Sequence, residues 1–168
     1  SDLQGQIWLD GNFCDWKDAK IHILTHTLHY GTGVFEGVRA YETEQGPAIF
    51  RLQDHTSRLF KSAELIGMNI PYSQTELMEA QCESVKINKL KNAYIRPLCF
   101  YGNEGMGLRA DNLKVHASVS SWDWGAYLGE DKIKNGIKVK VSPFPKRAAD
   151  SMLYKAKATG NYLNSMLA

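Results

Sequence analysis

The sequence has 168 residues, of which 43% are hydrophobic and 23% are charged, a composition typical of a globular protein and not of a disordered, collagen-like or coiled-coil chain. Twenty basic side chains against 18 acidic ones leave a formal charge of +2, so no nucleic-acid or membrane-surface partner is expected. No apolar run approaches the roughly 20 residues that a membrane span requires.

The three cysteines, Cys14, Cys82 and Cys99, are far apart and form no Cys-x-x-Cys pair. The first residues have neither the basic start nor the apolar core of a signal peptide. Both features favour reduced thiols in a cytoplasmic protein.

The first segments predict a hairpin, a short strand and a shaped loop. Asp10-Gly11 lies between apolar runs and suits a tight turn, because both positions tolerate positive φ. Residues 21–24 predict a strand, and the polar, glycine-rich residues 25–33 predict a loop.

A second hairpin is predicted next. Residues 34–42 alternate and are partly β-branched or aromatic, which predicts a strand. A turn at Gly46-Pro47 would return the chain as residues 48–52, the partner strand.

Two helices and two further strands follow. Apolar side chains recur at helical spacing in residues 59–67, and residues 73–76 (SQTE) form a capping box that predicts the start of a second helix. Residues 93–101 and 115–120 predict strands, with a turn at residues 111–112.

The character of the sequence changes after residue 120. We predict a small α+β domain over residues 1–120, a linker over 121–134 and the beginning of a second domain over 135–168. Residues 137–141 alternate valine or isoleucine with lysine, which predicts a half-exposed strand. Residues 160–168 predict a helix that has no stop signal before the last residue.

Three polar clusters predict no site of their own. His22, His26 and His29 recur at helical spacing, but they fall in a predicted strand and loop without acidic or cysteine ligands nearby, which favours packing roles over a metal site. Residues 102–107 (GNEGMG) match no nucleotide-binding pattern and predict a loop close to a ligand or a neighbouring backbone. The four lysines between residues 132 and 140 are typical of a solvated face.

Residues 156–162 (AKATGNY) place Lys157 among small side chains, which is unusual for a solvated surface and leaves room for a flat, bulky group beside its stem. A lysine amine suits imine chemistry because it loses its proton when desolvated and then attacks a carbonyl carbon. Tyr162 would bring a phenol to the same site. Taken alone, the segment fits an ordinary lysine before a helix, which is the simpler interpretation.

The segment does not stand alone, because five segments in chain order together resemble the class IV, or fold type IV, pyridoxal-phosphate aminotransferases. Residues 157–162 (KATGNY) are similar to the cofactor-lysine motif of that family. Five segments that span nearly the whole chain are far more specific than any one of them, and within the family they are most similar to bacterial branched-chain amino acid aminotransferases. The other four are residues 28–39 (LHYGTGVFEGVR), 55–59 (HTSRL), 93–98 (AYIRPL) and 124–129 (WGAYLG).

The resemblance implies a cofactor site for pyridoxal 5′-phosphate. Lys157 would hold the cofactor covalently, and its freed amine would move a proton between the substrate Cα and the cofactor C4′. Arg58 would bind the phosphate, because a forked, permanently charged guanidinium matches its oxygen geometry. Without the family, Arg58 would be a helix-surface residue paired with Asp54, and Tyr162, which would hydrogen-bond the ring hydroxyl oxygen, would be a packed aromatic.

The resemblance also implies transamination between a branched-chain L-amino acid (Leu, Ile or Val) and 2-oxoglutarate. Phe35, Trp124 and Tyr127 would offer an apolar wall for the branched side chain. Arg96, with Tyr94, would bind the side-chain carboxylate of glutamate or 2-oxoglutarate. Each is alternatively a core aromatic or a strand-surface charge. The full expected set of substrate-binding residues is Tyr30, Phe35, Gly37, Arg39, Tyr94, Arg96, Trp124 and Tyr127.

The implied fold is α+β: a small two-layer domain of mainly antiparallel sheet with two helices, followed by the truncated start of a larger α/β-type domain. In the family that larger domain continues beyond the lysine motif and supplies an acidic partner for the pyridine nitrogen, so the 168-residue chain is expected to be inactive alone. Some family site residues cross a dimer interface, which predicts a homodimer or higher homo-oligomer. The competing interpretations are a D-amino acid aminotransferase or aminodeoxychorismate lyase of the same fold, and a non-catalytic oligomerisation module.

Overall fold

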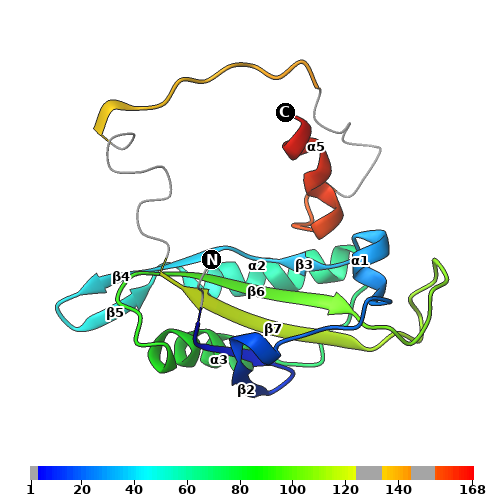
Figure 1. Ribbon diagram of the computed structural model, residues 1–168, viewed down its shortest axis with the longest axis horizontal. Coiled ribbons are helices and arrows are strands. Elements are labelled where there is room, and N and C mark those ends of the chain that lie inside the picture. The colour runs from blue at the N-terminus through cyan, green and yellow to red at the C-terminus, as the bar shows by residue number, and fades with distance from the viewer. Residues whose placement is uncertain (1–3, 124–133, 145–153) are drawn as a thin grey trace.

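The computed structural model describes residues 4–123, 134–144 and 154–168. Seven strands form one antiparallel sheet in the order β2-β1-β7-β6-β4-β5, and β3 pairs with β6 on the same edge as β4 (Figure 1). The strands are β1 (Gln6–Leu9), β2 (Asn12–Asp15), β3 (Val34–Phe35), β4 (Val38–Thr43), β5 (Gly46–Ile49), β6 (Ala93–Tyr101) and β7 (Val115–Trp122). The helices are η1 (Trp16–Asp18), α1 (His26–Tyr30), α2 (Leu52–Leu65), α3 (Gln74–Ile87), η2 (Thr159–Tyr162) and α5 (Leu163–Leu167).

The central ladder of the sheet joins β6 to β7 in register from Tyr94 opposite Trp122 to Tyr101 opposite Val115. Successive side chains of a strand point to opposite faces. On β6, Ile95 is fully buried in the core. The alternate β6 residues line a cavity described below, so one strand serves both the core and the candidate site.

The two long helices cover one face of the sheet and pack against each other (Figure 1). The capping box that the sequence predicts at the start of α3 is confirmed: Ser73 Oγ accepts from Glu76 N at 3.2 Å, and Glu76 Oε2 accepts from Ser73 N at 2.7 Å. Leu59 of α2 and Leu77 of α3 are at most 1% exposed. Burying such a side chain contributes about 1.5–3 kcal/mol each, which fixes the helices on the sheet.

The first hairpin forms as predicted, with positive φ at both Asp10 and Gly11. The next two predictions are wrong, because residues 21–24 form no strand and the predicted loop contains helix α1. The reason is tertiary. His26 is fully buried, its Nδ1 lies 3.0 Å from Thr32 Oγ1, and its Nε2 lies 3.0 Å from the carbonyl oxygen of Gly107.

The second hairpin differs from its prediction in two places. Residues 34–42 are divided into β3 and β4, and the turn lies at Glu44-Gln45, with Gly46 and Pro47 already in β5. Glu36 and Gly37 occupy the break between β3 and β4 because the Glu36 side chain turns toward α2, where it is fully buried. The predictions for β6, β7 and the turn at residues 111–112 are confirmed.

The later part of the chain returns to the sheet. Residues 137–141 form no strand, contrary to prediction, and their apolar side chains are exposed. Ala158 forms a β-bridge with Val34, and the predicted terminal helix appears as η2 followed by α5. Most of the linker predicted at residues 121–134 lies outside the described residues, so the domain boundary stays a prediction. No helix within the described parts of the chain is long and apolar enough to cross a membrane.

Candidate active site

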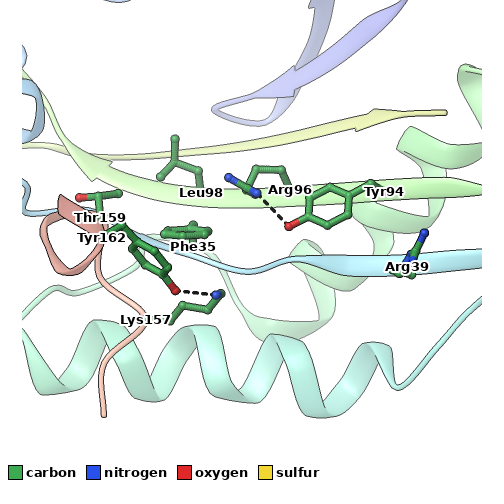
Figure 2. A pocket seen from close by; sticks show the side chains of 8 residues that line it. All are labelled: Phe35, Arg39, Tyr94, Arg96, Leu98, Lys157, Thr159 and Tyr162. Carbon is green, nitrogen blue, oxygen red and sulfur yellow. Dashed lines mark hydrogen bonds between the residues drawn. The ribbon is translucent and has the colours of Figure 1, made fainter. Parts of the chain in front are cut away.

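The lysine segment is anchored to the small domain through its backbone. Lys157 N donates to Ser62 Oγ of α2 at 3.0 Å, and Phe35 N donates to the carbonyl oxygen of Lys157 at 3.1 Å. Ala156 and Ala158, on either side, are buried in the core. The backbone of Lys157 is therefore fixed between a helix and a strand, while its side chain extends into a cavity (Figure 2).

The small residues of this segment serve close backbone packing, which corrects the interpretation that they leave room for a bulky group. Gly31 has φ +65°, and a Cβ there would lie 2.7 Å from the Cα of Gly160. Gly160 N donates to the carbonyl oxygen of Gly31 at 3.0 Å, and Thr159 N donates to that of Gly33 at 2.8 Å. Two segments of the predicted motif set thus join through glycine backbones that tolerate no side chain.

The lysine amine lies against an aromatic wall. Lys157 Nζ donates to Tyr162 Oη at 2.7 Å and lies 4.7 Å from the ring centroid of Phe35. The rings of Phe35 and Tyr162 are tilted with centroids 5.1 Å apart. The amine, the phenol and an apolar face therefore meet at one end of the cavity (Figure 2).

A second cation lies along the same cavity. The guanidinium of Arg96 stacks over the Phe35 ring at 4.6 Å, and its Nη2 donates to Tyr94 Oη at 2.8 Å. Its buried Nε has no hydrogen-bond partner among the described residues. A buried donor without a partner is costly, so Arg96 is suited to receive an acceptor from a ligand.

Gly37 is small because of Tyr94. A Cβ at Gly37 would lie 2.8 Å from the Cζ carbon of Tyr94 and closer still to its hydroxyl group. The glycine therefore lets Tyr94 occupy the position from which it accepts the bond of Arg96.

Arg58 lies on α2 and is not paired with Asp54, which binds Arg51 instead. Its Nε lies 2.5 Å from Glu36 Oε1 and its Nη2 lies 2.7 Å from Glu36 Oε2, while His55 Nδ1 lies 2.9 Å from the same Oε2. Burial raises the pKa of the Glu36 carboxyl, but the hydrogen bonds from Arg58 and His55 outweigh it and the net shift is downward. The hydrogen bond to Glu36 raises the pKa of Arg58, whose charge also interacts with Tyr162.

The cavity has a volume of about 730 Å³, within the range of small-molecule sites. It brings together six of the predicted residues. Two lining residues were missed, as were Glu36 and His55 behind Arg58. All four lie inside the family-like segments, and Glu36 was detectable as the single charge within VFEGV. The predicted lining residues are Phe35, Arg39, Tyr94, Arg96, Lys157 and Tyr162, and the missed ones are Leu98 and Thr159.

Three predicted residues are not placed in this cavity. Tyr30 lies on α1, where its hydroxyl donates to the carbonyl oxygen of Met106 at 2.8 Å and its ring lies 4.6 Å from that of His26. Trp124 and Tyr127 fall outside the described residues. Within the residues that are described, no three His, Cys, Asp or Glu side chains gather as a metal site.

The family model described as amino-transferase class IV matches residues 33–168, most of the chain and all of the cavity described above. The chain belongs to the class IV aminotransferases. This class IV aminotransferase is 56% identical over 168 residues to the branched-chain-amino-acid aminotransferase of Pseudomonas aeruginosa, and 42% identical over 162 residues to that of Escherichia coli strain K12. The match covers 55% and 52% of those relatives, so the chain spans about half their length.

Solved structures of class IV aminotransferases have the same fold. The crystal structure of the Escherichia coli branched-chain amino acid aminotransferase superposes with a TM-score of 0.95 at 41% identity, covering 98% of this chain and 55% of that one. The T.th. branched-chain amino acid aminotransferase with pyridoxamine 5′-phosphate gives 0.94 at 44% identity, covering 99% and 55%. The α+β architecture with a mainly antiparallel sheet is thereby confirmed.

Proposed function

We propose that this chain is the lysine-bearing part of a pyridoxal-phosphate-dependent aminotransferase that exchanges amino groups between branched-chain L-amino acids and 2-oxoglutarate. The observation that carries the proposal is the pairing of the Lys157 amine with Tyr162 Oη at one end of a cavity, with Arg96 further along it. The names of the relatives support the branched-chain class.

The side chains present fit pyridoxal 5′-phosphate. Lys157 would hold its aldehyde carbon, Tyr162 would hydrogen-bond the ring oxygen, and Arg58 would hold the phosphate with the guanidinium edge that Glu36 leaves open. When bound, the cofactor supplies an electron sink that acidifies the substrate Cα–H bond. The Lys157 amine, once free, accepts the proton from the substrate Cα and delivers it to C4′ of the cofactor.

The two ends of the cavity suit the two substrates. Phe35 and Leu98 offer an apolar surface for a branched side chain, and Trp124 and Tyr127 are proposed to extend it. The unpartnered Nε of Arg96 offers a charged donor for the distal carboxylate of 2-oxoglutarate or glutamate. One site could then accept an apolar and an acidic side chain in alternate half-reactions, because each meets a different wall.

The length of the relatives supports further proposals. Residues beyond the matched half would supply the acidic partner of the pyridine nitrogen and more phosphate donors, so we expect the 168-residue chain alone to be inactive. We propose a cytoplasmic homo-oligomer, with Tyr30 near the subunit contact. Several apolar side chains near α1 are exposed, among them Ile23 at 73% and Leu28 at 57%, which supports burial against another subunit.

The proposal is tested on the complete gene product. Borohydride reduction with pyridoxal phosphate should label Lys157, as located by mass spectrometry, and Lys157→Ala should lose both the label and the turnover of leucine with 2-oxoglutarate. Lys155→Ala is the matched control, because Lys155 is exposed in the same segment, and it should keep both. Labelling that persists in Lys157→Ala would contradict the assignment, and faster turnover of D-alanine or aminodeoxychorismate than leucine would redirect it to those activities.

A further inference from the structure

Glu36 is a fully buried carboxylate that the chemistry proposed above does not use. It lies between Phe35, which lines the cavity, and Gly37, which makes room for Tyr94. Its backbone N donates to the carbonyl oxygen of Pro97 at 3.0 Å, so the residue is fixed to the central strand β6. The side chain points away from the cavity lining toward helix α2, where two side chains one turn apart bind it.

The carboxylate is saturated by these two partners. Arg58 donates to both oxygens from Nε and Nη2, and His55 Nδ1 lies 2.9 Å from Oε2. A buried charge costs several kcal/mol unless it is paired, and an apolar side chain of similar size often stabilises a core equally well. Stability therefore gives a weak reason for this arrangement, whereas fixing the direction of a functional cation gives a strong one.

The bonds leave one edge of the guanidinium open. Nε and the near proton of Nη2 face Glu36, so Nη1 and the far side of Nη2 remain for another acceptor. The Arg58 side chain is 55% exposed, and without the fork it would sample several rotamers. Its charge interacts with Tyr162, which places it toward the Lys157 end of the cavity.

We propose that Glu36 is a positioning residue: it holds Arg58 edge-on, with His55 locking the carboxylate, so that the open edge of the guanidinium is preset to bind a phosphate monoester beside Lys157. The inference rests on the proposed function, in which Arg58 holds the cofactor phosphate. It predicts that Glu36 affects recognition of the phosphate and leaves the reaction of the Lys157 amine with the aldehyde unaffected.

The test compares pyridoxal phosphate with pyridoxal, which lacks the phosphate, in binding titrations of the complete gene product. Glu36→Gln should weaken pyridoxal phosphate about tenfold or more, since an ordered charged contact is lost, and change pyridoxal by less than about twofold. Glu42→Gln is the matched control, because it removes the exposed ion pair with Lys91 (2.8 Å), and it should change neither affinity. Retained pyridoxal binding also shows that the variant is folded.

Each other outcome decides a separate question. Equal loss of both ligands in Glu36→Gln would show a merely structural role and overturn the inference, as would an unchanged ratio of the two affinities. If Glu36→Gln does not fold, His55→Ala, which keeps the pair of Glu36 with Arg58, should still weaken pyridoxal phosphate selectively, by about threefold, and an unchanged ratio there would overturn the inference. Wild-type protein that attaches neither ligand at Lys157 would instead refute the proposed function.

Discussion

Replacing Gly37 by alanine should impair binding of the acidic substrate while leaving the fold intact. The added Cβ would lie 2.8 Å from Cζ and 3.3 Å from Cε2 of Tyr94, whereas carbon atoms pack at about 3.5–4.0 Å. The ring therefore has to retreat by roughly 1 Å. That movement breaks the 2.8 Å bond that Tyr94 accepts from Arg96, and a hydrogen bond to a charged group contributes about 1.5–3 kcal/mol.

The loss corresponds to roughly 10- to 100-fold in kcat/KM for glutamate, measured as a single half-reaction of the complete gene product. The leucine half-reaction should fall by less than about threefold, because an apolar side chain does not use the guanidinium. Gly67→Ala is the contrasting control. A Cβ there meets nothing within 4 Å but has to adopt φ +72°, so it should lower the free energy of unfolding by about 1 kcal/mol and leave both half-reactions unchanged. Equal losses for glutamate and leucine in Gly37→Ala would refute the reasoning.

Three further predictions concern stability and reactivity. The pKa of Glu36 lies below its ordinary value of 4.5 in the folded state, so its contribution to stability is complete above pH 4.5 and is lost as the pH falls through the lower folded-state pKa; urea unfolding at pH 7 and pH 3 should show a loss that Glu36→Gln lacks. Burial raises the pKa of the Cys99 thiol to about 12, so iodoacetamide at pH 8 should alkylate the exposed Cys82 first and Cys99 only after unfolding, as mass spectrometry can show; early labelling of Cys99 would contradict its burial. Ser73→Ala removes the N-cap of α3 and should lower the free energy of unfolding by about 1 kcal/mol, seen as a lower Tm, while an unchanged Tm would mean that Glu76 alone caps the helix.

The local elements were predictable where a few neighbouring residues decide the conformation. Asp10-Gly11 adopts positive φ because of its own side chains, and the Ser73 capping box closes within four residues. The β6 and β7 strands were recognised from their apolar, β-branched pattern. The exposed alternation of residues 137–141 misled, because a strand needs a partner ladder and the structure shows none for this segment.

By itself, the sequence determined the lysine chemistry and the family, because KATGNY and the four other segments lie contiguously in the chain and need no folding to be recognised. Only the tertiary structure decided how these segments meet: Gly31 against Gly160, and Glu36 against Arg58. It also made a helix of residues that were predicted to form a loop, since buried His26 bonds a residue 81 positions away. The physical reason is that a buried charge or imidazole takes its role from whichever partner the fold brings to it, and sequence spacing does not identify that partner.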